Sequence, residues 1–397
     1  MIQFLRFDSI DDYSFVPEST NNIWWEIHDD PNHYGPRFAG PDWVHDLNFL
    51  HDSYGKLVFG SNHKFININL NEDLEKQITN NSQITNVIHF ILPVKIENFY
   101  TEQNILKKVA EKFKHLKYVK FCFSNTWDLY DTNTDKIQLA THLVEQLSDI
   151  EPERIFVFAC NKFFTDELKQ IAPNWNTHYF NYFFRDLKVK TPSYVSHNDL
   201  REKHFLCLNN VSKPHRQAIF DHLDDNKSYK SMLSKNISLD LEKNLRLELK
   251  RPVDFGHTLP TYYTKNSYIM ICNETYFYGD NKPTGWLTEK SLKPMLSEQM
   301  FIIVSRKGIH SLVQDLGFKL FDQVIDYSFD TQDDGERLES IKKEIDRLSN
   351  ISIQELHEIY VSDYVQDILK HNKTVFEEHT KLNPSVVLAG REISNRI

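Results

Sequence analysis

The stretch YIMICNETYFYGDNKPTGWLTEKSLKPMLSEQMFIIV, residues 268–304, decides the fold class. It opens with an apolar run at 268–272 that predicts a buried strand, and it closes with a second such run at 301–304. Between the two runs, residues 288–297 show the pattern of a helix. A strand, a helix and a strand in this order indicate parallel strands joined by a helix that covers the sheet. We therefore expect a fold of the α/β class.

The same alternation extends through the chain on both sides of this stretch. In the first half, strand patterns at 87–94, 118–123 and 154–159 alternate with helical patterns at 102–116 and 135–147. A strand at 204–208 and a helix at 214–223 precede the opening stretch. Residues 191–203 lose apolar periodicity and gather turn-forming residues, which favours a domain boundary there. We predict an N-terminal α/β domain over 1–195, a C-terminal α/β domain over 203–335 and a helical annex over 336–397.

Length and composition limit the architecture and the ligand chemistry. A chain of 397 residues with 40% hydrophobic residues is long enough for two Rossmann-like domains. Neither G-x-G-x-x-G nor G-x-x-x-x-G-K-[ST] occurs, which argues against the dinucleotide fingerprint and the Walker loop. Any phosphate is then expected to be held by side chains and helix ends. The best candidate is a GT-B-like architecture, in which two such domains face a cleft.

Cysteines and charge bear on the compartment and on the partners. The four cysteines, Cys122, Cys160, Cys207 and Cys272, lie far apart in or beside apolar runs, which favours buried, reduced thiols. The N-terminal residues lack the pattern of a signal peptide, and no apolar stretch is long enough to cross a membrane. A cytoplasmic protein without a membrane partner is therefore expected. The net charge of −10 gives no global attraction to nucleic acid, although a local basic groove stays open.

The polar group Thr288-Glu289-Lys290 stands at the start of the helix in the opening stretch. Open α/β sheets bind ligands at the carboxyl ends of their strands, where this group would lie. A lysine at a helix start can hold a diphosphate, and a neighbouring carboxylate can accept hydrogen bonds from ribose hydroxyls. The plainer alternative is that Thr288 caps the helix, Glu289 favours its dipole and Lys290 is solvated.

A second polar group opens the same predicted domain. The segment LCLNNVSKPHR at 206–216 places Asn210 and Lys213 in a loop and Arg216 in the first turn of a helix. Arg216 can present a bidentate fork to a phosphate. The N-terminus of a helix carries a partial positive charge, so cations there are unfavourable. An anionic ligand would offset this, whereas the alternative of a solvated basic surface would not.

Three features of the C-terminal half together resemble a known family. They are the run from His204 to Arg216, the strand at 268–272, and the motif T-E-K-x-x-K-P followed by F-I-I-V-x-x-x-G. They look like the donor-binding half of glycosyltransferases from tailed phages and large viruses, and are more distantly similar to alpha-1,3-fucosyltransferases and exostosin-like enzymes. The resemblance covers about 203–345. It implies a role for Glu289 at the donor ribose and for Lys290 and Arg216 at its phosphates. The N-terminal half has no matching motif.

Further candidates are less specific. Arg306 or Lys307, in the loop after the strand at 301–304, could reach the sugar or a phosphate, with a solvated turn as the alternative. For the catalytic base we consider Asp128 and Asp131, with Trp127 beside them to stack on the acceptor. The polar segment 28–33 is the rival site. No D-x-D motif lies between apolar strands, so we expect no metal and leaving-group stabilisation by Lys290 and Arg216.

These residues predict transfer of a sugar from a nucleoside diphosphate, a UDP-sugar, to a hydroxyl group. The phage-like resemblance suggests 5-hydroxymethylcytosine in phage DNA as the acceptor, inside an infected host cell. Double-stranded DNA would then meet a local stripe of lysines, Lys107, Lys108, Lys112, Lys114, Lys117 and Lys120, which a solvated helix face explains equally well. The alternatives are a surface or capsular glycan as acceptor, and a non-catalytic protein that binds nucleotide sugar or another chain.

Overall fold

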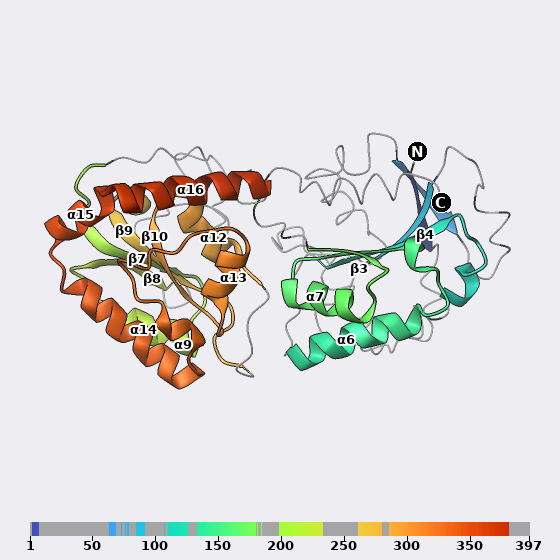
Figure 1. Cartoon of the computed structure of the whole chain (residues 1–397), viewed down its shortest axis with the longest axis horizontal. Coiled ribbons are helices and arrows are strands. Elements are labelled where there is room, and N and C mark those ends of the chain that lie inside the picture. Colours follow the sequence, from blue (N-terminus) through green and yellow to red (C-terminus); the bar gives the residue numbers. More distant parts are fainter. Residues whose placement is uncertain are drawn as a thin grey trace. The chain divides into compact units, whose positions relative to one another are not determined.

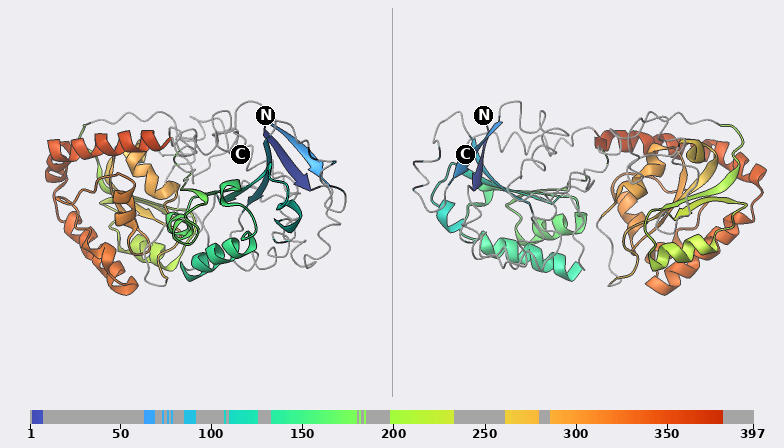
Figure 2. Two further views of the ribbon diagram at one scale, coloured as in Figure 1. Left: turned by 45° about the vertical axis from the view of Figure 1, so that its right-hand side comes forward. Right: turned by 180° about the vertical axis from the view of Figure 1, so that it is seen from behind.

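The structure is a computed structural model. It describes residues 2–7, 63–68, 85–91, 110–125, 133–179, 198–232, 261–279 and 286–380, with single residues at 73, 76, 78, 107, 181 and 184. The chain divides into two compact units, one of residues up to Asn181 and one of Tyr182–Lys381. Each unit contains a parallel sheet with helices packed beside it (Figures 1 and 2). The predicted α/β class is confirmed.

The first unit is built on a six-stranded parallel sheet with the order β2-β1-β3-β4-β5-β6. Its strands are β1 (Ile2–Phe7), β2 (His63–Ile68), β3 (Thr85–Ile91), β4 (Val119–Asn125), β5 (Ile155–Ala159) and β6 (Asn176–Tyr179). Helices α6 (Asn133–Gln146) and α7 (Lys162–Ile171) follow β4 and β5 and lie side by side (Figure 1). A fully buried apolar core that includes Phe121, Val157 and Phe164 joins these helices to the sheet.

The second unit has a four-stranded parallel sheet between two layers of helices. The strands are β7 (Lys203–Asn209), β8 (Ser228–Met232), β9 (Ser267–Asn273) and β10 (Met300–Val304). Helices α9 (Pro214–His222) and α14 (Asp334–Ser349) lie on one face, and α12 (Glu289–Leu296) and α16 (Asp363–Thr380) lie on the other (Figure 1). The remaining helices are α11 (Thr261–Lys265), α13 (Ile309–Asp315) and α15 (Ile353–Val361), with 3-10 turns at Pro152–Arg154 and Ser328–Thr331.

The strand order of the second sheet contains one reversal. The order is β10-β9-β7-β8, so the chain leaves β7 for β8 on one side and later returns to place β9 on the other side. The reversal therefore falls between β7 and β9. Ligands of open parallel sheets bind outside the carboxyl ends of the strands at such a point. The last residues of these two strands, Asn209 and Asn273, thus mark the expected binding position.

The helices of the predicted C-terminal annex belong to the second unit. The Tyr360 hydroxyl, on α15, donates to the carbonyl of Glu298 at 3.1 Å. The Asn372 side chain, on α16, accepts from the amide of Lys319 at 2.8 Å and donates to its carbonyl at 2.9 Å. The helices α15 and α16 therefore help to close one face of the sheet. None of the described helices has the length and apolar character needed to cross a lipid bilayer.

Candidate functional site

The segment Glu274–Tyr276, directly after β9, is the centre of the candidate site. The backbone carbonyl of Glu274 accepts hydrogen bonds from Arg216 Nη2 at 3.0 Å and from His215 Nε2 at 3.0 Å. Lys213 Nζ donates to the Thr275 carbonyl at 2.8 Å. All three donors stand at the start of α9, where Pro214 occupies the first turn. The start of α9 is therefore held against the end of β9.

The start of α12 is held against the same segment by the side chain of Glu274. This carboxylate, only 3% exposed, accepts from the Thr288 amide at 3.1 Å and from the Thr288 hydroxyl at 2.8 Å. The Ser291 hydroxyl donates to it as well. Thr288 is the helix N-cap, and its oxygen accepts from the amide of Lys290 at 3.2 Å. A buried carboxylate at a helix N-terminus is stabilised by these donors and by the helix dipole.

Glu289 and Lys290 form an ion pair in the first turn of α12. Lys290 Nζ lies 2.5 Å from Glu289 Oε1, and the Glu289 carboxylate is almost completely buried. Burial alone would lower the pKa of Lys290, but the carboxylates of Glu289 and Glu274 outweigh it and raise that pKa. Lys290 therefore stays charged, with part of its side chain still exposed.

Arg216 is the third member of this group. Its guanidinium is buried, and its hydrogen bonds go to the backbone carbonyls of Val211 and Glu274. Burial lowers its pKa, while the charges of Glu274 and Glu289 oppose that shift. The charge of Arg216 in turn opposes the rise in the pKa of Lys290, without cancelling it. The structure thus brings Arg216, Glu289 and Lys290 within electrostatic reach of one another.

Two more cations gather on one aromatic ring. Lys213 Nζ lies 4.9 Å from the centroid of the Tyr276 ring, and the guanidinium carbon of Arg306 lies 5.3 Å from it. Among the described residues, the site therefore holds four cations, Lys213, Arg216, Lys290 and Arg306, against the two carboxylates of Glu274 and Glu289. The surplus of positive charge in a partly buried setting suits a dianionic group such as a diphosphate.

Asn210 and the preceding residue, Asn209, differ in burial. Asn210 is exposed in the loop after β7. Asn209 is buried, and its Oδ1 accepts from Asn273 Nδ2 at 3.0 Å across the paired ends of β7 and β9. Sequence reasoning did not single out this amide pair. The repeated polar residue at the end of two apolar strands was the available signal.

Sequence reasoning also missed Glu274 and Arg337, which support the site. Glu274 was visible as an acidic residue directly after an apolar strand. Arg337, at the start of α14, is 1% exposed and donates to the carbonyls of Phe277 at 3.0 Å and Ser305 at 3.1 Å. Arg337 thereby joins the loop after β9 to the loop after β10. No local pattern distinguishes it from a surface arginine of a charged helix.

The predicted acceptor residues, Trp127, Asp128 and Asp131, lie outside the described residues, as does the rival segment 28–33. Within the part of the chain that the structure describes, no group of three His, Cys, Asp or Glu side chains is placed to hold a metal ion.

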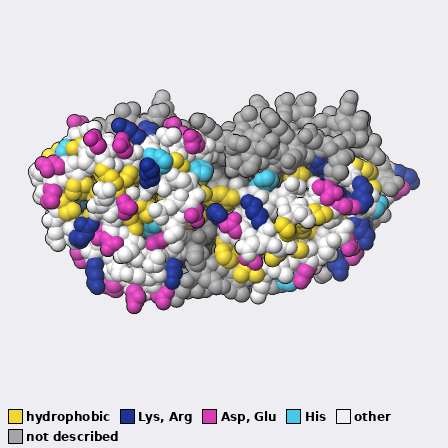
Figure 3. All heavy atoms as spheres, viewed as in Figure 1, with side chains coloured by type: hydrophobic (Ala, Val, Ile, Leu, Met, Phe, Trp, Pro, Cys, Tyr) yellow, Lys and Arg dark blue, Asp and Glu magenta, His cyan; other side chains and the backbone are white. Residues whose placement is uncertain are grey.

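The predicted lysine stripe is only partly a free basic surface. Lys114 pairs with Asp149 at 3.3 Å, and Lys117 pairs with Glu151. Lys120 is buried, with its Nζ 5.5 Å from the centroid of the Phe156 ring. On the face of the second unit shown in Figure 3, basic and acidic side chains are intermixed. Neither observation adds support for a track of DNA phosphates.

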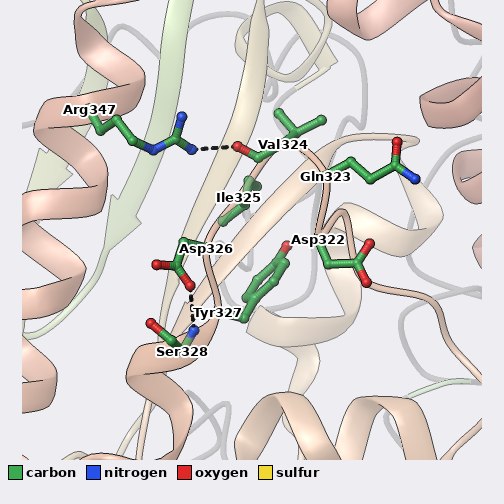
Figure 4. A pocket seen from close by; sticks show the side chains of 8 residues that line it. All are labelled: Asp322, Gln323, Val324, Ile325, Asp326, Tyr327, Ser328 and Arg347. Carbon is green, nitrogen blue, oxygen red and sulfur yellow. Dashed lines mark hydrogen bonds between the residues drawn. The ribbon is translucent and has the colours of Figure 1, made fainter.

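A shallow pocket of the second unit lies elsewhere. It is lined by residues 322–328 and by Arg347, whose Nη2 donates to the Val324 carbonyl at 2.5 Å (Figure 4). The amide of Ser328 donates to Asp326 at 2.9 Å on its rim. None of the four cations of the candidate site lines it. The pocket is therefore separate from the cluster around Glu274.

Comparisons with known proteins include a distant structural likeness. No protein-family model matches the chain, and no curated protein matches it in sequence. A crystal structure of an alpha,alpha-trehalose-phosphate synthase (UDP-forming) from Burkholderia vietnamiensis is similar with a TM-score of 0.34 and 9% identity, over 94% of this chain and 87% of that chain. The function proposed below rests on the side chains of the site.

Proposed function

We propose that this chain is a glycosyltransferase whose second unit binds a nucleoside diphosphate sugar, a UDP-sugar, at the carboxyl edge of the β7–β10 sheet. The observation that carries the proposal is the gathering of Arg216, Glu289 and Lys290 beside the reversal of strand order between β7 and β9. Positive charge, a helix start and a switch point of a parallel sheet coincide there. Together they suit a nucleotide diphosphate.

In this proposal the residues of the site bind different parts of the nucleotide sugar. Lys290 and Arg216 bind the diphosphate, and Glu289 accepts hydrogen bonds from ribose hydroxyls. In the structure Lys290 is paired with Glu289. When Lys290 pairs with the diphosphate instead, the Glu289 carboxylate becomes free to accept hydrogen bonds from the ribose. Thr288 fixes the helix start, while Asn210, Lys213 and Arg306 complete the donor site.

Transfer breaks the bond between the anomeric carbon and the phosphate oxygen, and the electron pair stays on the nucleoside diphosphate. The acceptor hydroxyl oxygen forms the new bond to that carbon, and its proton passes to a base. Asp128 or Asp131 is our candidate for this base, with Trp127 against the acceptor. The cations stabilise the charge that develops on the leaving group, so the proposal requires no metal. A GT-B arrangement of the two units is part of the same proposal.

The proposed acceptor is 5-hydroxymethylcytosine in phage DNA, and it rests on the sequence resemblance alone. A surface or capsular glycan is the alternative acceptor. A protein that binds nucleotide sugar without transferring it is the alternative function. Incubation with hydroxymethylated DNA, simple glycans and a panel of UDP-sugars, followed by mass spectrometry of the products, separates the three. UDP-sugar binding with no transfer to any acceptor would favour the non-catalytic alternative.

The donor assignment is tested by replacing Lys290 with alanine. Lys290→Ala removes a charge-assisted contact and should weaken UDP binding by about 1.5 to 3 kcal/mol in calorimetry. The matched control is Lys342→Ala, because Lys342 is also paired with a glutamate, Glu339 at 2.8 Å, but on α14 away from the site. Equal UDP affinity in Lys290→Ala and the wild type would contradict the proposed donor site.

A further inference from the structure

Arg306 stands out among the cations of the site because no carboxylate of the described residues forms an ion pair with it. It follows β10, and its guanidinium lies over the Tyr276 ring and against Gly279. Its Nε is buried and has no hydrogen-bond partner in the described part of the chain. An unsatisfied buried donor of a charged group is costly unless a ligand completes it.

The other cations of this region are better compensated. Lys290 is paired with Glu289, and Arg216 lies in the field of Glu274 and Glu289. Lys307, the residue after Arg306, is paired with Asp333 at 3.3 Å. Arg306 has no such ion pair among the described residues, and Lys213 brings a second positive charge to the same ring. An anion bound by the Arg306 guanidinium would supply the countercharge that the described residues lack.

The four cations form two pairs at successive positions of the segment Glu274–Tyr276, directly after β9. Arg216 and Lys290 surround Glu274, whereas Lys213 and Arg306 share the ring of Tyr276, two residues further on. Arg306 also follows β10, one strand beyond β9 in the sheet, and adjacent strands lie about 4.8 Å apart. The positive charge of the site is thus spread over two neighbouring positions, which matches the two phosphates of a diphosphate.

We infer that Arg306, placed on the Tyr276 ring beside Lys213, binds the second phosphate of the donor, the one bonded to the sugar. This inference rests on the proposed function. It makes Arg306 the residue that distinguishes a nucleoside diphosphate from a monophosphate, and it makes Tyr276 and Gly279 positioning residues that fix the guanidinium. Lys290 and Arg216 then serve the first phosphate, which both nucleotides carry.

The test compares UDP and UMP by calorimetry on the full chain. Arg306→Gln keeps a planar polar side chain but removes the charge, so UDP affinity should fall about 10- to 100-fold, the range of a charge-assisted hydrogen bond. UMP affinity should stay unchanged within error. The control is Lys307→Gln, which makes the same change of charge in the next residue and should leave both affinities at their wild-type values.

A second variant moves the guanidinium without removing its charge. A Cβ at Gly279 would lie 2.9 Å from Arg306 Nε, so Gly279→Ala must displace that side chain. It should lower UDP affinity in the same direction as Arg306→Gln, again with UMP unaffected. The inference is overturned if either variant binds UDP as the wild type does, or if UDP and UMP affinities fall equally. A wild-type protein that binds neither nucleotide would instead overturn the proposed function.

Discussion

At the scale of single residues, Glu274 has the largest number of roles in the candidate site. Its carbonyl accepts a hydrogen bond from Arg216 in the first turn of α9, and its carboxylate accepts one from Thr288, the N-cap of α12. A carboxylate is suited to the second task because it is only an acceptor, and every group that faces it there is a donor. The residue thus fixes the positions of Arg216 and Lys290 without having to contact a ligand.

Glu274→Gln tests this role. The substitution keeps the shape of the side chain but turns one acceptor oxygen into an NH2 group that faces donors, which should cost about 1 to 3 kcal/mol of unfolding free energy. UDP affinity should fall as well, although no cation has been removed. Glu339→Gln makes the same change at an exposed residue of α14 and should alter neither quantity. Wild-type stability and UDP affinity in Glu274→Gln would refute the role.

At the scale of elements, α14 fixes the loop after β9 and the loop after β10, which contain residues of the site. Arg337 donates to carbonyls in both loops, and Asp334 accepts from the amide of Gly279 at 3.0 Å. The start of α13 is fixed separately by Gly308, whose φ of 78° lies in the left-handed region that favours glycine. Asp330 completes this start, because its carboxylate accepts from the amides of His310 at 3.1 Å and Ser311 at 3.2 Å.

Arg337→Leu should therefore destabilise the second unit strongly. It leaves the carbonyls of Phe277, Ser305 and Gln332 without their buried donor and Asp334 without its partner, at a cost of about 3 to 5 kcal/mol. Urea denaturation measures the loss. Lys343→Leu removes an exposed cation from the same helix and should change stability by less than about 0.5 kcal/mol. Similar effects of the two substitutions would show that Arg337 does not anchor these loops.

At the scale of the whole molecule, buried histidines make stability depend on pH. Burial lowers the pKa of His215 from 6.5 to about 4, and the charges of Arg216 and Lys213 add to this effect. Its Nε2 donates to the Glu274 carbonyl, and its ring stacks on Phe277 with centroids 5.4 Å apart. The folded protein therefore keeps this imidazole neutral at a pH at which the unfolded chain would protonate it.

The sign of the resulting pH dependence follows directly. Above pH 6.5 both states are neutral at His215, and between 6.5 and about 4 only the unfolded chain gains a proton. Unfolding free energy should thus be lower at pH 5 than at pH 7, with His215 contributing about 2 kcal/mol. Denaturation of His215→Asn should show a smaller difference between the two pH values, whereas the partly exposed His371→Gln should keep the full difference. An undiminished difference in His215→Asn would contradict the prediction.

The sequence predicted several local elements of the molecule, although the strands β1, β2, β6 and β8 were not among the elements it indicated. The strand expected at 118–123 forms at Val119–Asn125, the one expected at 204–208 forms at Lys203–Asn209, and the helix expected at 288–297 forms at Glu289–Leu296. The two strands are apolar runs, and the helix has apolar periodicity and a capping residue, Thr288. The proximity of Thr288, Glu289 and Lys290 to a strand end was predictable for the same reason.

The sequence by itself thus determined the α/β class, the strands β3, β4, β5, β7, β9 and β10, and the motif at the start of α12. Only the tertiary structure decided that the strand order reverses between β7 and β9 and that Arg216 meets the Glu274 carbonyl 58 residues away. It also decided that Arg306 shares the ring of Tyr276 with Lys213. The physical reason is that periodicity reports which face of an element is buried, whereas strand order and contacts between distant loops depend on how all the elements pack together.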